Sequence, residues 1–465
     1  MKFCEDRVKG IKIAYIGGGS RGWAWTFMSE LALAKDISGE VALYDIDYEA
    51  AKKNEVIGNR FNTAKNAHSV WNYKAVGTIG EALTGADFVI ISILPGTFDE
   101  MESDVHAPEK YGIYQSVGDT VGPGGIVRSM RTVPMFEEIA QSIKKYCPKA
   151  WVINYTNPMT ICVKTLYRVF PEIKAYGCCH EVFGTQKVLA HIVSEKFGVK
   201  NIDRHEIKVN PLGVNHFTWL TEAKYNDVDL FPIYREYIEK HPEGIKSEIE
   251  NDSNWFVLAA NKTSEKVKFD LFKKFGFIAA AGDRHLAEFC DRKWYLESPE
   301  RVEEMGFALT PVASRREDLE NRLKKSERLF NGEEEPKVYV TGEEGVNQIR
   351  ALLGLEDLVT NANVPNFGQI PNLPIGAVVE TNVVFRSGSL VPVFAGNIPK
   401  EIFPMISRVC AEQEALSDAI AVRDVNEIFR VFSGDALVTC NLSDAQKLFY
   451  EMLQNTKEYL KMYSF

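Results

Sequence analysis

Short apolar runs alternate with longer amphipathic stretches through the first 200 residues. The apolar runs are short enough to be buried strands, and they lie at 11–16, 40–44, 87–93 and 151–153. Apolar positions at helical spacing predict helices at 23–34, 49–67, 132–146 and 185–197. This alternation is typical of a doubly wound parallel sheet, with ligands beyond the carboxyl ends of the strands. We therefore expect residues 1–200 to form an α/β, Rossmann-like domain.

The pattern changes beyond residue 200. Strands are expected at 205–209 and 213–225, a mostly helical region at about 226–350, a strand at 377–385, and helices at about 400–431 and 443–460. The charged run 318–337 is typical of a solvated helix and turn without a catalytic role. We expect residues 201–465 to form an α+β domain for substrate, metal and oligomer contacts.

A glycine-rich turn follows the first predicted strand and opens the first predicted helix. An acid, Asp45, ends the second strand 23 positions beyond Gly22, with Asp47 as a competitor. This setting predicts a dinucleotide site in which the acid accepts the ribose hydroxyls, so that NAD is favoured over NADP. Ser92 and Asn154, which end later strands, should lie beside the nicotinamide. The predicted loop consists of Gly17, Gly18, Gly19, Ser20, Arg21 and Gly22.

Composition narrows the possible partners. The net charge of −10 argues against nucleic acid or a membrane surface as the ligand, because both are bound through basic patches. No apolar stretch resembles a signal peptide or a membrane span, so we expect a cytoplasmic protein. The eight cysteines have no C-x-x-C spacing, and in a reducing compartment Cys179 can serve as a thiolate ligand.

Two stretches carry candidate chemistry outside the glycine loop. In the first, Cys178 and Cys179 precede His180 and Glu181, although adjacent cysteines are more often the buried end of a strand than a metal site. The second, residues 118–131, contains Asp119, Arg128 and Arg131 and reads either as a surface loop or as a substrate loop beside the crevice.

Five motifs in order resemble glycoside hydrolase family 4, nearly from end to end. They are the glycine loop, Asn154-Tyr155-Thr156-Asn157-Pro158, Cys179-His180-Glu181-Val182, Asn215-His216, and Asn366-Phe367-Gly368-Gln369-Ile370-Pro371-Asn372-Leu373-Pro374. The resemblance implies a lactate/malate dehydrogenase-like architecture and a glycosidase that needs NAD and a divalent metal, usually Mn²⁺. It also implies a homodimer or homotetramer.

Within that family, the Cys-His-Glu-Val form resembles the α-galacturonidase subgroup, which implies a small sugar-acid glycoside as the substrate. An α-glucuronidase or α-glucosidase of the family is the alternative, because such members tend to carry Gly or Ser in place of Glu181. A simple NAD-dependent 2-hydroxy-acid dehydrogenase and an NAD-binding sensor are further alternatives. A dehydrogenase would need no thiolate metal site and would produce NADH.

The resemblance also implies residue roles. Cys179 and His216 become metal ligands, and Asn157 a contact to sugar hydroxyls. The implied reaction is oxidation at C3, proton removal at C2, elimination of the aglycone, addition of water and reduction. Asp283 is the predicted base that removes the C2 proton, with a helix cap as its equally weighted alternative.

The acid that assists departure of the aglycone has two candidates. His180 ranks first because its ordinary pKa is near neutrality, and Asp119 ranks second. Glu181 is expected either to contact the substrate or to orient a neighbouring group. An Arg fork suits a uronate carboxylate, and the candidates are Arg128, Arg131 and Arg284.

Overall fold

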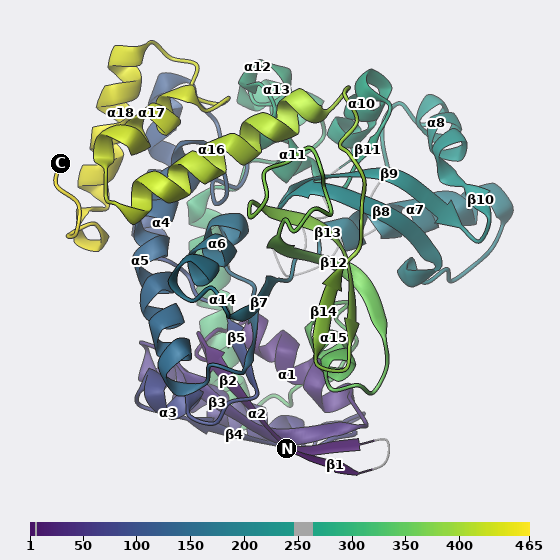
Figure 1. Cartoon of the computed structure of the whole chain (residues 1–465), viewed down its shortest axis with the longest axis vertical. Coiled ribbons are helices and arrows are strands. Elements are labelled where there is room, and N and C mark those ends of the chain that lie inside the picture. The colour runs from purple at the N-terminus through teal and green to yellow at the C-terminus, as the bar shows by residue number, and fades with distance from the viewer. Residues whose placement is uncertain (5–6, 246–263) are drawn as a thin grey trace.

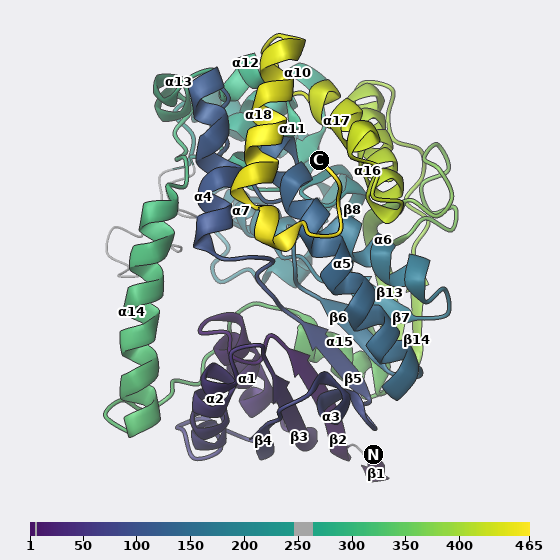
Figure 2. The ribbon, with the colours of Figure 1, turned by 90° about the vertical axis from the view of Figure 1, so that its left-hand side faces the viewer.

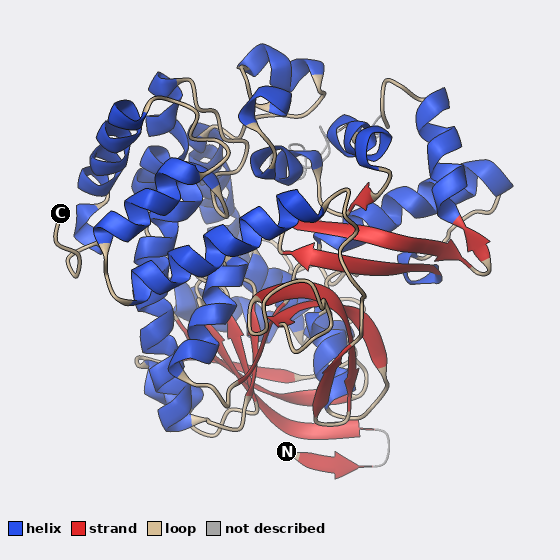
Figure 3. Cartoon of the chain, turned by 45° about the horizontal axis from the view of Figure 1, so that its top comes forward, coloured by secondary structure: helices blue, strands red, loops and turns tan. Residues whose placement is uncertain are grey.

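The computed structural model describes residues 1–4, 7–245 and 264–465, and its strands form one continuous mixed sheet. Figure 3 shows the strands running through the molecule with helices packed around them. Part of the predicted helical region, residues 246–263, lies outside the described residues. The sheet has 14 strands, and its central path runs in the order β10-β9-β8-β13-β12-β7-β6-β5-β2-β3-β4.

The parallel half of this sheet confirms the doubly wound prediction. Strand β2 pairs in parallel with both β3 and β5, so the strand order reverses at β2. Apolar side chains on both faces of these strands fill two cores beneath the helices. The strands of this half are β2 (Arg7–Ile16), β3 (Ile37–Tyr44), β4 (Trp71–Ala75), β5 (Phe88–Ile91), β6 (Trp151–Asn154) and β7 (Lys174–Gly177), and β1 (Lys2–Cys4) pairs antiparallel with β2.

Helices connect these strands (Figure 1). Predicted helix 49–67 ends at Phe61, and the predicted strands at 11–16 and 40–44 begin earlier than expected. The helices are α1 (Trp23–Leu33), α2 (Tyr48–Phe61), α3 (Ile79–Leu83), α4 (Phe98–His106), α5 (Gly122–Tyr146), α6 (Met159–Val169) and α7 (Glu181–Phe197), with a 3₁₀ turn at Ala107–Tyr111.

The predicted loop 118–131 is wrong in its second half, because α5 already begins at Gly122. Pro123 suits the first turn of a helix, where its missing N–H costs nothing. A Cβ on Gly125 would lie 2.4 Å from the carbonyl carbon of Thr120, so the helix start packs against the preceding loop. Arg128 and Arg131 therefore project from a buried helix.

Antiparallel strands continue the sheet. Strand β12 lies between the predicted helical region and the predicted strand 377–385, where no strand was predicted, and it joins β7 to β13. These strands are β8 (Ile207–Val214), β9 (Phe217–Tyr225), β10 (Val228–Asp229), β11 (Ile278–Ala279), β12 (Leu358–Pro365), β13 (Val378–Arg386) and β14 (Ser389–Pro392).

Helices of the second half cover the antiparallel strands and close the chain. Helix α14 has only three buried residues, which confirms the prediction of a solvated helix, and in Figure 2 it runs along the outside of the molecule toward α2. No described helix is long and apolar enough to cross a membrane. The described helices here are α8 (Leu230–Lys240), α10 (Lys266–Phe275), α11 (Asp283–Phe289), α12 (Arg292–Tyr295), α13 (Pro299–Glu304), α14 (Val312–Asn331), α15 (Gly345–Leu352), α16 (Phe403–Ala421), α17 (Val425–Gly434) and α18 (Leu442–Asn455), with 3₁₀ turns at Arg204–Glu206 and Lys457–Tyr459.

Candidate active site

The glycine loop lies at the point where the strand order reverses. Gly17 has φ +93°, and a Cβ there would lie 2.0 Å from the backbone oxygen of Ser92, so only glycine fits. The Asp45 carboxylate accepts the Gly19 N–H at 2.8 Å. Gly18 packs against Leu43, where a Cβ would come within 2.8 Å. The loop and the predicted acid are therefore brought together at the end of β2 and β3.

The rest of the loop turns into α1. The Ser20 N–H donates to the Gly17 oxygen at 3.0 Å, and Gly22 is the N-cap of the helix. Arg21 pairs with Asp47 at 3.5 Å. Asp47 also caps α2, while Asp45 accepts the Asp47 N–H at 2.9 Å as well as that of Gly19, so Asp45 is the acid held against the glycine loop. The Arg322 guanidinium of α14 lies against Gly22, so this solvated helix also reaches the glycine loop.

Asn154 and Ser92, the two residues expected beside the nicotinamide, differ in how their side chains are bonded. Both amide atoms of Asn154 bond to the Thr156 backbone at 3.0 Å, and the side chain is fully buried. The amide of Asn154 therefore shapes the loop after β6, and its position beside the nicotinamide stays a prediction. Ser92 lies at the end of β5 and is only partly buried.

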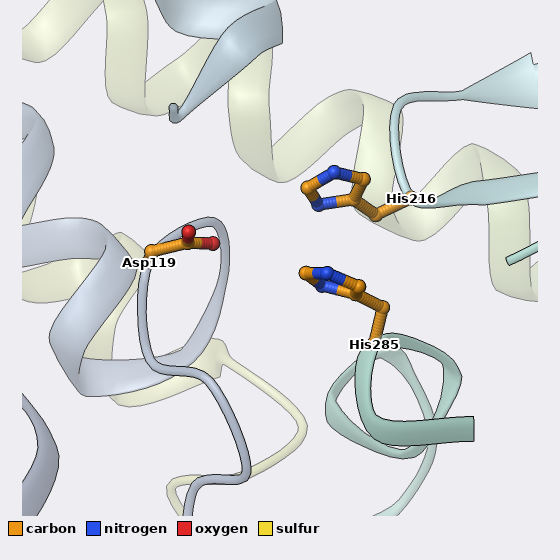
Figure 4. Close-up of side chains that lie close together, drawn as sticks. All are labelled: Asp119, His216 and His285. Atoms are coloured by element: carbon orange, nitrogen blue, oxygen red, sulfur yellow. The ribbon is translucent and has the colours of Figure 1, made fainter. Parts of the chain in front are cut away.

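Three side chains from distant segments meet in a possible metal site (Figure 4). One ligand atom from each of Asp119, His216 and His285 lies within 4.8 Å of the other two. The two imidazole rings have centroids 3.9 Å apart. Asp119 comes from the loop before α5, His216 from the β8–β9 turn, and His285 from α11. Sequence reasoning gave His285 no role, although it lies two residues after Asp283.

The β8–β9 turn holds His216 in an unusual backbone conformation. Its φ is +65°, a left-handed value that a non-glycine residue seldom adopts and that is common at functional sites. Nδ1 of this ring lies 3.1 Å from the Thr120 hydroxyl, which leaves Nε2 for a ligand. Burial, with the adjacent His285, lowers the pKa of His216 to about 3, so the ring is neutral and able to coordinate.

Glu181 lies close to the imidazole of His285. Its Oε1 lies 3.6 Å from Nε2 of His285, and its Oε2 accepts the Gly282 N–H at 2.6 Å. Nδ1 of His285 is buried and has no hydrogen-bond partner among the described residues. Burial would raise the pKa of Glu181, but His285, His180 and His216 hold it at about 2. This carboxylate is therefore placed to orient an imidazole, as partners of metal-binding histidines do.

Asp119 is held ionised and connected to Asn157. Burial would raise its pKa, but His285, Arg128 and His216 keep it well below its usual range. The Asn157 amide donates to the Asp119 carboxylate at 3.2 Å, and the Asn157 side-chain oxygen has no partner among the described residues. The Asp119 carboxylate and the Asn157 side-chain oxygen can therefore accept hydrogen bonds from a ligand.

Cys179 lies beside this group but is not one of its three members. The thiol is buried next to the side chain of Asn215, which is also fully buried. Burial, followed by Glu380 and Glu181, raises the pKa of Cys179 well above its ordinary value. A cation would counter these negative charges and favour the thiolate. Cys178 packs in a different core, behind β7.

His180 lies apart from the metal group and close to α1. Its Nδ1 is 3.0 Å from Glu343, and its ring stacks on Trp23 with centroids 5.9 Å apart. Burial would lower its pKa, but the Glu343 hydrogen bond and the charges of Glu343 and Glu181 raise it to about 9. His180 is therefore protonated at neutral pH. Sequence reasoning missed Glu343, which is more than 160 positions away.

The candidate arginines differ in how far their hydrogen bonds are already used. Arg131 forms a bidentate ion pair with Asp104, and both side chains are 0% exposed, so Arg131 is wrong as a candidate for the sugar carboxylate. Nε of Arg128 donates to the backbone oxygen of Asn157 at 3.2 Å. Arg284 donates through Nη2 to the Ser116 oxygen at 2.9 Å, while its buried Nε has no partner in the described structure.

The Asp283 carboxylate faces a helix terminus. It accepts the backbone N–H of Val267 at 3.2 Å and of Lys268 at 3.1 Å, at the start of α10, and is fully buried. It is not a member of the Asp119–His216–His285 group. The N-cap of α11 is Gly282, so Asp283 caps the neighbouring helix α10 and not its own, and its role as the base stays a prediction. Burial, with the charge of Glu265, raises the pKa of Asp283 to about 7.

The arrangement fits both a dinucleotide and a divalent metal. A glycine-rich loop, an acid at its side and the start of α1 provide a cradle for a pyrophosphate and ribose. Imidazole, carboxylate and thiol groups that retain free ligand atoms are donors that divalent transition metals accept. The site can therefore combine hydride transfer with polarisation of a substrate oxygen.

Comparison with known proteins shows the class to which this fold and site belong. The model for family 4 glycosyl hydrolases matches residues 12–195, and the model for their C-terminal domain matches residues 212–438. The chain belongs to glycosyl hydrolase family 4.

Individual relatives agree with this assignment. An alpha-galacturonidase from Thermoanaerobacterium saccharolyticum is 58% identical, and the match covers 99% of this chain and 98% of the relative. A crystal structure of a Bacillus subtilis protein described as a glucosidase is 50% identical, covers 96% of this chain and 100% of that one, and has a TM-score of 0.90. A Thermotoga maritima 6-phospho-beta glucosidase structure with manganese, NAD⁺ and glucose-6-phosphate is 21% identical, covers 97% and 99%, and has a TM-score of 0.76, which shows a shared fold.

Proposed function

We propose that this protein is an α-galacturonidase that depends on NAD and a divalent metal. The observation that carries the proposal is the alpha-galacturonidase that is 58% identical over nearly the whole of both chains. The Cys179-His180-Glu181-Val182 sequence supports the same substrate. An α-glucuronidase or α-glucosidase of the family is the alternative, and family membership disfavours the simple hydroxy-acid dehydrogenase.

Each cofactor has a defined chemical task. When bound, NAD supplies a reversible hydride acceptor and the metal, which is manganese in one structural neighbour, supplies a Lewis acid. We assign NAD to the loop Gly17–Gly22 and Asp45, with Ser92 nearby. His216 and Cys179 are the proposed metal ligands, and the positions of Asp119 and His285 beside His216 support their participation.

His180 is the proposed acid. A group with a pKa of about 9 carries a proton at neutral pH and can give it to a departing sugar oxygen. Asp119 is ionised by its surroundings, and an ionised carboxylate cannot donate a proton, so we assign it to sugar hydroxyls or the metal instead. Asn157, beside Asp119, would hold the same hydroxyls. Asp283 remains the proposed base, provided that its contact with α10 opens when the substrate binds.

Two adjacent thiols provide a matched test of the metal site. Cys179→Ser should lower the affinity for Mn²⁺ by 10-fold or more, measured by electron paramagnetic resonance of free Mn²⁺. Cys178→Ser, at a buried position in another core, should bind Mn²⁺ as the wild type does. Equal Mn²⁺ affinity of the two variants would remove Cys179 from the metal site.

The assay that tests the function itself combines the purified protein with NAD, Mn²⁺, a reductant and an α-galacturonide. Free galacturonate without net NADH is the expected result. Cleavage of an α-glucuronide or α-glucoside in place of the galacturonide would contradict the proposed substrate and retain the family. Net NADH formation from a hydroxy acid would contradict the proposed reaction.

We also propose a cytoplasmic homodimer or homotetramer whose chain divides near residue 200. The family models meet between residues 195 and 212, which supports that division. Multi-angle light scattering of the full chain tests the oligomer, and a monomer would contradict it.

A further inference from the structure

We propose that Arg315, in the first turn of α14, binds the C5 carboxylate of the sugar together with Arg284. The inference rests on the proposed function and names the residues that select a sugar acid over a neutral sugar. Neither the motifs nor the charged-run interpretation of α14 pointed to Arg315.

Two guanidinium groups of this region have buried N–H donors that the described residues leave without an acceptor. Nε of Arg315 and Nε of Arg284 are both buried, and neither has a hydrogen-bond partner among the described residues. In the same part of the chain, neither side chain forms an ion pair, whereas Arg131 and Arg316 do. The two side chains are half-buried with each Nε enclosed, and an incoming carboxylate would satisfy these donors through charge-assisted hydrogen bonds.

The electrostatic surroundings place both arginines near the metal group. Burial, then the positive charge of Arg315, lowers the pKa of Arg284 to about 10. Burial also lowers the pKa of Arg315, while Asp119 and Glu288 act in the opposite direction. The two cations therefore lie close enough to repel each other, and both interact with Asp119. An anion between the two guanidinium groups would reduce their mutual repulsion, which Asp119 and Glu288 already offset in part.

The other arginines of this region have fewer hydrogen-bond donors left for a ligand. Arg131 is fully used by Asp104, and Nε of Arg128 already donates to Asn157. Nη2 of Arg284 donates one hydrogen bond to the backbone oxygen of Ser116, whereas Arg315 donates none to the described residues. The guanidinium of Arg315 therefore keeps its donors free of the described residues, and such planar forks match carboxylates in a bidentate way.

The start of α14 is anchored firmly enough to position a side chain. Val312 packs against Met101 and Val105 of α4, and its N–H donates to Nε2 of His106 at 3.1 Å. The next arginine along the helix, Arg316, points to Asp99 on the surface. Arg316 is therefore a matched control, since it has the same charge and helix turn but a different direction.

The test compares Arg315→Gln, Arg315→Lys and Arg316→Gln with the wild type. We measure galacturonate and galactose affinities by calorimetry in the presence of NAD and Mn²⁺, and kcat/KM for the α-galacturonide and the α-galactoside. Arg315→Gln should weaken galacturonate binding by about 10- to 100-fold, as expected for lost hydrogen bonds to a charged group, and reduce discrimination against the neutral sugar similarly. Arg315→Lys should lose part of this, because it keeps charge but not the fork. Arg316→Gln should match the wild type.

The outcomes separate this inference from the proposed function. Equal galacturonate affinity in the wild type and Arg315→Gln would overturn the inference, and so would an equal loss for galacturonate and galactose. Circular dichroism melts of all variants identify a loss caused by unfolding, and Arg315→Lys then decides if Arg315→Gln does not fold. A wild type that binds galacturonate through Arg315 but cleaves no galacturonide would overturn the function alone.

Discussion

Breaking the buried ion pair between Arg131 and Asp104 should destabilise the protein without changing its sugar preference. The two guanidinium Nη atoms bond to the two carboxylate oxygens, and Nε donates to the Pro95 oxygen at 2.9 Å. Because both side chains are 0% exposed, removal of one partner leaves the other charge buried, which typically costs about 3–5 kcal/mol. The pair also joins α4 to α5, so removing it should weaken the packing between these two helices.

The two single variants should differ in a defined direction. Burial raises the pKa of Asp104 against the effect of Arg131, so in Arg131→Met the remaining carboxyl can take up a proton and avoid part of the cost. An unpaired guanidinium cannot lose its proton, so Asp104→Leu should be the more damaging variant. The double variant should recover most of the stability, because an apolar pair of similar volume replaces the ion pair.

Urea denaturation followed by circular dichroism measures these differences, and kcat/KM with an α-galacturonide and an α-galactoside measures sugar preference. We expect Arg131→Met to unfold at a lower urea concentration and to keep the wild-type ratio of the two kcat/KM values. Unfolding at the wild-type midpoint, together with a selective loss of galacturonide activity, would refute the structural role of Arg131 and restore it as a carboxylate contact.

Three further predictions concern other parts of the chain. Gly17→Ala should raise the Kd for NAD by 10-fold or more in a fluorescence titration, because the new Cβ would lie 2.0 Å from the Ser92 oxygen, and an unchanged Kd would contradict the loop assignment. Asp283→Ala should cost about 1–2 kcal/mol of stability through loss of the α10 cap, and turnover retained well below its melting temperature would exclude Asp283 as the base. Burial and the charge of Asp435 raise the pKa of Glu412 to about 7, although Arg408 acts in the opposite direction. The folded protein therefore binds the Glu412 proton more tightly than the unfolded chain does. The stability that this proton gives to the folded protein is lost as the pH rises from about 4.5 to 7. Glu412→Gln should therefore gain in urea midpoint relative to the wild type between pH 5 and pH 8, and no relative gain would contradict this sign.

The dinucleotide half could be predicted from the sequence because its signals are local. A strand, a glycine turn and a helix follow one another within about 25 residues, and the glycines are required by contacts with Ser92 and Leu43. Strand β12 was missed because Asn and Pro are uncommon in strands, whereas here buried Asn361 and Asn363 bond to Glu380 on β13. Tertiary contacts outweighed the propensity.

The candidate site could be predicted only in part, because its residues meet through the fold. His285 carries no local signal that distinguishes it from Asp283, and only the packing of α11 against the β8–β9 turn turns one toward His216 and the other toward α10. Arg315 lies in a charged helix whose sequence predicts a solvated surface, yet its Nε is buried and the start of the helix packs against α4. Periodicity describes which face is buried, but not which distant residue that face meets.

Hydrolysis of an α-galacturonide in D₂O with NAD and Mn²⁺ present, followed by mass spectrometry and NMR of the released sugar, tests whether cleavage proceeds through oxidation and removal of the C2 proton. We expect free galacturonate with deuterium at C2, no net NADH, and no product when either NAD or Mn²⁺ is omitted. Release of galacturonate with hydrogen retained at C2, or hydrolysis that continues without NAD, would contradict it.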